Sequence, residues 1–158
     1  MVKILLAEDN MVDQTALAEY LKNNLTDHTL DTVKSCKEML STLDSGNVYD
    51  IIILDHILED EQSLKYIDKI IAKASGAQLV VLSGQSDISV CIQYLNAGVY
   101  AYLNKENNAF KNLVKNINEI INKKVVKEAP VKFNSPLVYV IAAFVLLVII
   151  ALVLVMMN

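Results

Sequence analysis

The feature that most constrains the fold is a regular alternation of short apolar runs with amphipathic segments over the first 123 residues. Five apolar runs are typical of buried strands, and the segment after each has the apolar spacing of a helix. Strands that alternate with helices in this way form a parallel sheet covered by helices on both faces. Five units are too few for an eight-unit barrel, so the sequence predicts an open, doubly wound α/β fold.

The boundaries of these elements follow from the apolar runs and from capping residues. Asn10 can cap the first helix through its side chain, and Gly98 is placed to end the fourth helix. The expected strands are residues 2–7, 29–33, 50–54, 78–82 and 99–103, and the expected helices are 10–24, 35–43, 59–74, 86–96 and a last one around 110–123.

A second constraint is the 21-residue run Leu137–Met157, which carries no charge. As a helix it would reach about 31 Å, which matches the hydrocarbon core of a bilayer. Four lysines lie between residues 123 and 132, and lysines beside a span favour the cytoplasmic side. The sequence therefore predicts a cytoplasmic domain over residues 1–123, a linker with lysine and proline over 124–136, and a single-pass C-terminal membrane anchor over 137–157.

The charge distribution argues against a nucleic acid partner. Residues 1–104 carry 7 Lys and 15 Asp or Glu, and the chain has no arginine. Nucleic-acid binding relies on basic patches and on bidentate arginines, so an acidic domain of this kind is poorly suited to it. Cys36 and Cys91 lie in helical segments without metal-ligand spacing, and we expect reduced thiols in or near the core.

Polar side chains suited to phosphoryl chemistry stand where the predicted strands end. In doubly wound sheets the ligand binds at this edge, so we expect these groups to converge. Clustered carboxylates repel one another unless a cation joins them, and several hard oxygen ligands favour Mg²⁺. A hydroxyl and an ammonium suit the oxygens of a phosphoryl group, which a carboxylate can accept. The residues are Glu8 and Asp9 after the first strand, Asp55 after the third, Ser83 after the fourth and Lys105 after the fifth.

The chain resembles the receiver domains of two-component response regulators over residues 2–123. Four segments carry the resemblance: LLAEDN, IIILDHIL, VVLSGQ and YLNKEN. It implies a flavodoxin-like sheet of strand order 2-1-3-4-5 and Asp55 as the phosphoacceptor. It also implies an aromatic switch residue at Tyr102. The implied Mg²⁺ ligands are Glu8, Asp9, Asp55 and the backbone carbonyl of Ile57, and the implied phosphoryl contacts are Ser83 and Lys105.

Three residues near the acceptor depart from the family pattern. Glu59 stands four residues after Asp55, where receivers usually have proline. Ser63 stands eight residues after it, where they usually have glycine, and Glu106 follows the lysine in place of a frequent cis-proline. No catalytic group is lost. The departures affect the loop after the third strand, and through it the rate of phosphorylation and the choice of kinase.

The resemblance implies a signalling receiver, and the predicted anchor makes it a membrane-tethered one. No DNA-binding output domain is expected, because only the linker 124–136 separates the receiver from the anchor. Its partners would be a sensor histidine kinase or phosphotransfer protein and a downstream protein. Its chemistry would be limited to autocatalytic phosphotransfer and self-dephosphorylation, so it is not expected to be an enzyme in the usual sense. We expect partners to read the face formed by the fourth helix, fifth strand and fifth helix, where Tyr94 and Tyr102 lie.

Other functions are compatible with parts of the pattern. A membrane-anchored scaffold or phosphate sink with a receiver-like pocket would carry the same residues. A haloacid-dehalogenase-type phosphatase also uses an aspartate nucleophile and Mg²⁺, but it needs a second aspartate where Ile57 stands. A flavodoxin-type cofactor protein is disfavoured, because no phosphate loop rich in Ser, Thr and Gly follows the first strand.

Overall fold

The computed structural model describes residues 1–59, 61–106 and 108–128 of the chain, with side chains through residue 124. The chain divides into two compact units, residues 1–124 and 125–158, and the fold described below is that of the first. Among the described residues, no helix has both the length and the apolar character needed to cross a membrane. The predicted membrane anchor, residues 137–157, lies outside the described residues.

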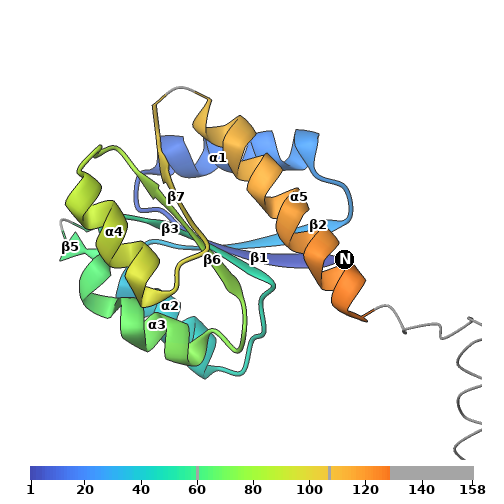
Figure 1. The fold of residues 1–158 in the computed structure, drawn as a ribbon, viewed down its shortest axis with the longest axis horizontal. Helices are drawn as coiled ribbons and strands as arrows, with labels where there is room; N and C mark the ends of the chain where they lie inside the picture. Colours follow the sequence, from blue (N-terminus) through green and yellow to red (C-terminus); the bar gives the residue numbers. More distant parts are fainter. Residues whose placement is uncertain (60, 107, 129–158) are drawn as a thin grey trace, which may run out of the picture. The chain divides into compact units, whose positions relative to one another are not determined.

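The central sheet has five parallel strands in the order β2-β1-β3-β6-β7 (Figure 1). Counted along the chain, this is the order 2-1-3-4-5, so the predicted flavodoxin-like topology is confirmed. All five residues of β3 are buried, as expected for a central parallel strand with both faces covered. The strands are β1 (Val2–Ala7), β2 (His28–Val33), β3 (Ile51–Asp55), β6 (Gln78–Ser83) and β7 (Ala101–Asn104).

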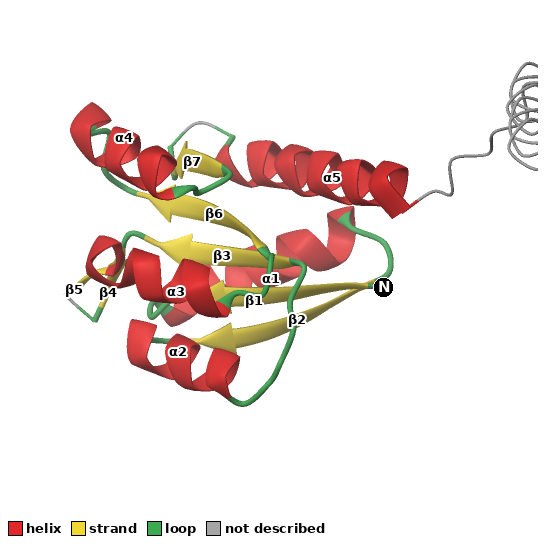
Figure 2. Ribbon diagram, turned by 60° about the horizontal axis from the view of Figure 1, so that its bottom comes forward, coloured by secondary structure: helices red, strands yellow, loops and turns green. Residues whose placement is uncertain are grey.

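Helices cover both faces of this sheet (Figures 1 and 2). One face carries α1 (Met11–Asn24) and α5 (Ala109–Glu128). The other carries α2 (Cys36–Asp44), α3 (Ile67–Lys73) and α4 (Ile88–Ala97). The last helix continues five residues beyond its predicted end, into the segment assigned to the linker.

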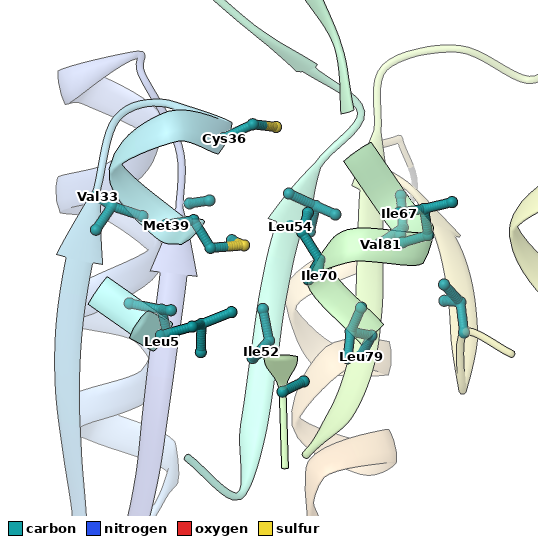
Figure 3. Close-up of a cluster of buried hydrophobic side chains, with 14 of the residues drawn as sticks. Leu5, Val33, Cys36, Met39, Ile52, Leu54, Ile67, Ile70, Leu79 and Val81 are labelled. Carbon is teal, nitrogen blue, oxygen red and sulfur yellow. The ribbon is translucent and has the colours of Figure 1, made fainter. Parts of the chain in front are cut away.

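Alternate side chains of the strands build two separate cores. In β3, Ile52 faces the cluster that α2 and α3 cover, and Figure 3 shows it there beside Met39 and Ile70. Its neighbour Ile53 faces the opposite cluster, where Leu113 of α5 packs. Each fully buried side chain of this size contributes about 1.5–3 kcal/mol through removal of apolar surface from water. The two cores therefore hold the strand ends in a defined arrangement.

Both capping predictions agree with the structure. The Asn10 side chain accepts hydrogen bonds from the backbone N–H groups of Val12 and Asp13 at the start of α1. Gly98 follows α4 with a φ of 101°, a left-handed conformation that strains other residues.

The prediction of a helix over residues 59–74 is wrong in its first half. The chain instead forms an antiparallel hairpin of β4 (Ile57–Leu58) and β5 (Glu61–Gln62), then a 3-10 turn, η1 (Ser63–Tyr66). The helix α3 begins only at Ile67. The physical reason lies at Glu59, whose φ of 50° belongs to a turn and cannot continue a right-handed helix.

Ile53→Ala should lower the free energy of unfolding by about 2–5 kcal/mol, because it leaves a cavity at a fully buried position in the central strand. Urea unfolding of the full chain measures the change. Val12→Ala is the matched control, since Val12 is 76% exposed, and we expect a change within about 0.5 kcal/mol. A similar small change for Ile53→Ala would contradict the assigned core.

Candidate functional site

The register of the strands brings the predicted site residues to one edge of the sheet. Ala7 of β1 pairs with Leu54 of β3, and Asp55 pairs with Leu82 of β6. Glu8, the next residue after Ala7, therefore lies at the level of Asp55. Figure 2 shows the five strands pointing toward this same edge.

Three carboxylates meet there. Glu8, Asp9 and Asp55 each offer one carboxylate oxygen, and these oxygens lie within 4.8 Å of one another. Glu8 and Asp55 are buried, so water screens their charges poorly. Three hard oxygen ligands in one place suit Mg²⁺, which usually keeps several waters in its coordination shell. The residues present therefore fit the predicted cation.

The ammonium of Lys105 bridges two of these carboxylates, Glu8 and Asp55, and also contacts Asp13. Its Nζ lies 2.6 Å from Asp55 Oδ2, 2.8 Å from Glu8 Oε2 and 3.2 Å from Asp13 Oδ2. Burial alone would lower the pKa of Lys105, but its hydrogen bonds to Asp55 and Glu8 outweigh burial and raise that pKa. The lysine therefore stays charged.

Asp13 was not predicted as part of this site. It lies in the first turn of α1, the helix that begins two residues after Asp9. That proximity in sequence is the signal that could have found it. Glu8, Asp13 and Lys105 also line a small pocket, together with Leu17, Leu82 and Phe110.

Glu8 is the acid of the cluster whose ionisation burial opposes. Burial raises the pKa of Glu8 to about 7, with Lys105 opposing this rise and the charge of Asp55 adding to it. Its Oε1 accepts a hydrogen bond from the Asn10 backbone N–H at 3.2 Å. A divalent cation bound at the cluster would favour the ionised form, as it would for any acid among its ligands.

Ser83 and Tyr102 are joined through the loop after β6. The buried Ser83 hydroxyl accepts a hydrogen bond from the Gln85 backbone N–H at 2.9 Å. The Tyr102 hydroxyl donates to the Gln85 carbonyl at 3.2 Å. Lys105 also donates its backbone N–H to the Ser83 carbonyl at 2.7 Å. Ser83, the predicted phosphoryl contact, and Tyr102, the predicted switch residue, are thus both hydrogen-bonded to the backbone of Gln85. The backbone bond from Lys105 links Ser83 to the acidic cluster.

The loop after β3 contacts the acidic cluster through backbone N–H groups. The N–H of Ile57 donates to Asp55 Oδ1 at 3.2 Å, and that of Glu59 donates to Asp9 Oδ2 at 3.1 Å. Proline has no N–H and cannot adopt the positive φ of Glu59. The departure at Glu59 therefore gives this loop a bond that proline would abolish. The role of the Ile57 carbonyl as a metal ligand stays a prediction.

A buried polar group lies behind the site, on the other face of β3. His56 Nδ1 lies 2.9 Å from the Tyr94 hydroxyl, which lies 2.8 Å from Ser63 Oγ. Ser63 Oγ donates to the backbone carbonyl of Asp55 at 2.7 Å. The expectation that Tyr94 lies on a partner surface is wrong, because Tyr94 is fully buried and its hydroxyl is used here. Nothing in the sequence pattern signals this group.

Residues 4–118 match the response regulator receiver domain family, and the chain belongs to that family. Receiver domains accept a phosphoryl group on an aspartate, and they receive it from histidine kinases or phosphotransfer proteins. They are phosphoacceptors and not classical enzymes.

Protein RcaC from Microchaete diplosiphon is 35% identical over 106 residues, which are 66% of this chain and 16% of RcaC. The chain thus corresponds to a small part of that relative. A CheY-like receiver domain protein from Methanospirillum hungatei JF-1 has a TM-score of 0.71 at 18% identity, covering 80% of this chain and 98% of its own. A Burkholderia pseudomallei response regulator with a phosphorylated aspartic acid, calcium ion and citrate has a TM-score of 0.64 at 21% identity, covering 81% and 75%. At these identities the two structures establish the shared fold.

Lys105→Met should destabilise the domain by roughly 1–3 kcal/mol when no divalent cation is present, because it leaves buried carboxylates without their counter-charge. Added Mg²⁺ should raise the Tm of this variant more than that of the wild type. Thermal unfolding with and without Mg²⁺ tests this, with the exposed Lys111→Met as control. Equal Mg²⁺ responses in all three proteins would contradict the cation site.

Proposed function

We propose that the chain is a membrane-tethered phosphoreceiver in which Asp55 accepts a phosphoryl group from a sensor histidine kinase or phosphotransfer protein. Glu8, Asp9, Asp55 and the Ile57 carbonyl would bind Mg²⁺. The observation that carries the proposal is the bridge from Lys105 to the acidic cluster, with Nζ 2.6 Å from Asp55 Oδ2. An ammonium bonded to the acceptor carboxylate is placed to stay with the phosphoryl oxygens after transfer.

The chemistry assigned to each residue follows from its position. One carboxylate oxygen of Asp55 attacks phosphorus as the bond from phosphorus to the donor nitrogen breaks, and an acyl phosphate results. Bound Mg²⁺ supplies charge neutralisation for the phosphoryl oxygens. The Ser83 hydroxyl can rotate away from Gln85 and donate to one of them. Hydrolysis of the acyl phosphate by water restores Asp55 and ends the signal.

We propose α4 as part of the surface that a downstream protein reads. Ile88, Ile92 and Leu95 are 75%, 50% and 46% exposed, and their spacing places them on one side of the helix. The helix carries no charged residue. Tyr102 lies next to it, 5.6 Å from the ring of Tyr94 in α4. An exposed apolar row beside the switch residue favours signalling over a mere phosphate sink.

Acetyl phosphate with Mg²⁺ should label the wild type at a single residue, and Asp55→Asn should abolish the label because the amide cannot act as the acceptor. Mass spectrometry of the intact chain measures the label. Asp50→Asn is the matched control, because Asp50 precedes β3 at the end opposite Asp55. Asp55 of this variant should be labelled as in the wild type. Label that persists in Asp55→Asn, or that is indifferent to a chelator, would refute the proposal.

The membrane tether is proposed from the apolar segment 137–157 and from the lysines before it. The direction of α5 supports an exit away from the phosphorylation site. This helix begins at the edge where the strands end and runs to the opposite edge (Figure 2). There Lys124 Nζ lies 2.6 Å from Asp50 Oδ1, one residue before β3 begins. A domain held at this end would leave Asp55 open to a kinase.

The full chain expressed in cells should remain in the membrane pellet after alkaline extraction, whereas a chain ending at residue 136 should be released. The reason is that 21 apolar residues bury enough surface to make insertion effectively irreversible. Immunoblotting of the two fractions gives the result. Release of the full chain by alkali would show that segment 137–157 does not anchor it.

A further inference from the structure

The hydrogen-bonded group behind the acceptor strand has a role that goes beyond packing. We propose that Ser63, Tyr94 and His56 are positioning residues for the metal and phosphoryl chemistry at Asp55. They set the course of the loop over residues 55–63. The inference rests on the proposed function, because it concerns the same metal site.

Ser63 closes this loop with two bonds to consecutive residues. Its N–H donates to the His56 carbonyl at 2.8 Å, and its Oγ donates to the Asp55 carbonyl at 2.7 Å. Between these anchor points lie Ile57 and Glu59, whose N–H groups contact the carboxylates of the acidic cluster. A glycine at position 63 could make the first bond but not the second. The serine therefore holds the loop at the carbonyl of the acceptor itself.

The direction of each hydrogen bond follows from this starting point. A carbonyl can only accept, so the Ser63 hydroxyl proton is committed to Asp55, and Ser63 Oγ must accept from the Tyr94 hydroxyl. The Tyr94 oxygen can then only accept from His56, which must carry its proton on Nδ1.

The buried Nε2 of His56 agrees with this order. His56 is only 1% exposed, and its Nε2 makes no hydrogen bond of ordinary length among the described residues. With the Nδ1 proton directed at Tyr94, Nε2 is left as an acceptor, and the side chain of Gln85 is a polar group close to the ring.

Tyr94 extends the effect to α4. It is fully buried, and its ring packs at 5.7 Å from His56 and 5.6 Å from Tyr102. The same hydroxyl that orders Ser63 therefore anchors α4 to the end of β3. Removing these hydrogen bonds should therefore weaken Mg²⁺ binding by changing the loop between Asp55 and Ser63, although none of the three side chains is a metal ligand.

Mg²⁺ titration of the full chain, in detergent and followed by NMR, tests the inference without any phosphoryl transfer. Tyr94→Phe and Ser63→Ala should each weaken Mg²⁺ binding about threefold to tenfold, at or below the range typical of groups that orient metal ligands. The Mg²⁺ affinity of the double variant should be no more than about twofold below that of the single variant that binds Mg²⁺ less tightly, because the two residues act as one unit.

Tyr49→Phe is the matched control. Its buried hydroxyl also bonds a side chain, Asp31 Oδ2, at 2.8 Å, but this pair is not among the contacts of the acidic cluster. We expect its Mg²⁺ affinity to stay within about twofold of the wild type. The positioning role is overturned if Tyr94→Phe leaves the Mg²⁺ affinity unchanged, or if Tyr49→Phe lowers that affinity as much as Tyr94→Phe does.

A spectroscopic readout tests the order of the bonds directly. The ¹⁵N spectrum of the imidazoles should show His56 protonated at Nδ1, and His28→Gln assigns the signals because the chain has only two histidines. A proton on Nε2 would overturn the inference. If the wild type is not labelled at Asp55 but Tyr94→Phe and Ser63→Ala still weaken Mg²⁺ binding, the proposed function is refuted. The positioning role of these residues at the metal site would then stand.

Discussion

The structure depends on the enclosure of several carboxylates at one edge of a parallel sheet. Like charges at this distance in a poorly screened site are unfavourable, and Lys105 offsets the repulsion with bonds to Glu8 and Asp55. The two apolar cores on either side of β3 provide the rigidity that keeps the acids together. Close packing of these acids is therefore costly for the fold, and a cation bound at the cluster would reduce that cost.

The sheet and the convergence of its strand ends could be predicted because they depend on patterns with a simple period. Runs such as residues 51–54 are apolar at every position, as expected of a short strand covered on both faces. The residue that follows such a run must lie at the sheet edge, and this rule placed Asp55 beside Glu8. Family resemblance added the roles of the residues but was not needed for their proximity.

The loop after β3 could not be predicted for an equally physical reason. Its path is set by bonds between residues far apart in sequence, such as Glu59 with Asp9 and Ser63 with Tyr94. The apolar spacing of α3 continues upstream as far as Leu64, so local periodicity suggested an earlier start for the helix. No feature of the sequence indicates the positive φ of Glu59 or the burial of the Tyr94 hydroxyl.

The order of the site residues along the chain has a consequence for how the protein folds. Every carboxylate of the cluster belongs to the first 55 residues, whereas the lysine that neutralises them is residue 105 and follows the last strand to join the sheet. During synthesis the early strands can pair before their counter-charge has emerged. A divalent cation held by the early strands would neutralise these carboxylates until Lys105 is in place.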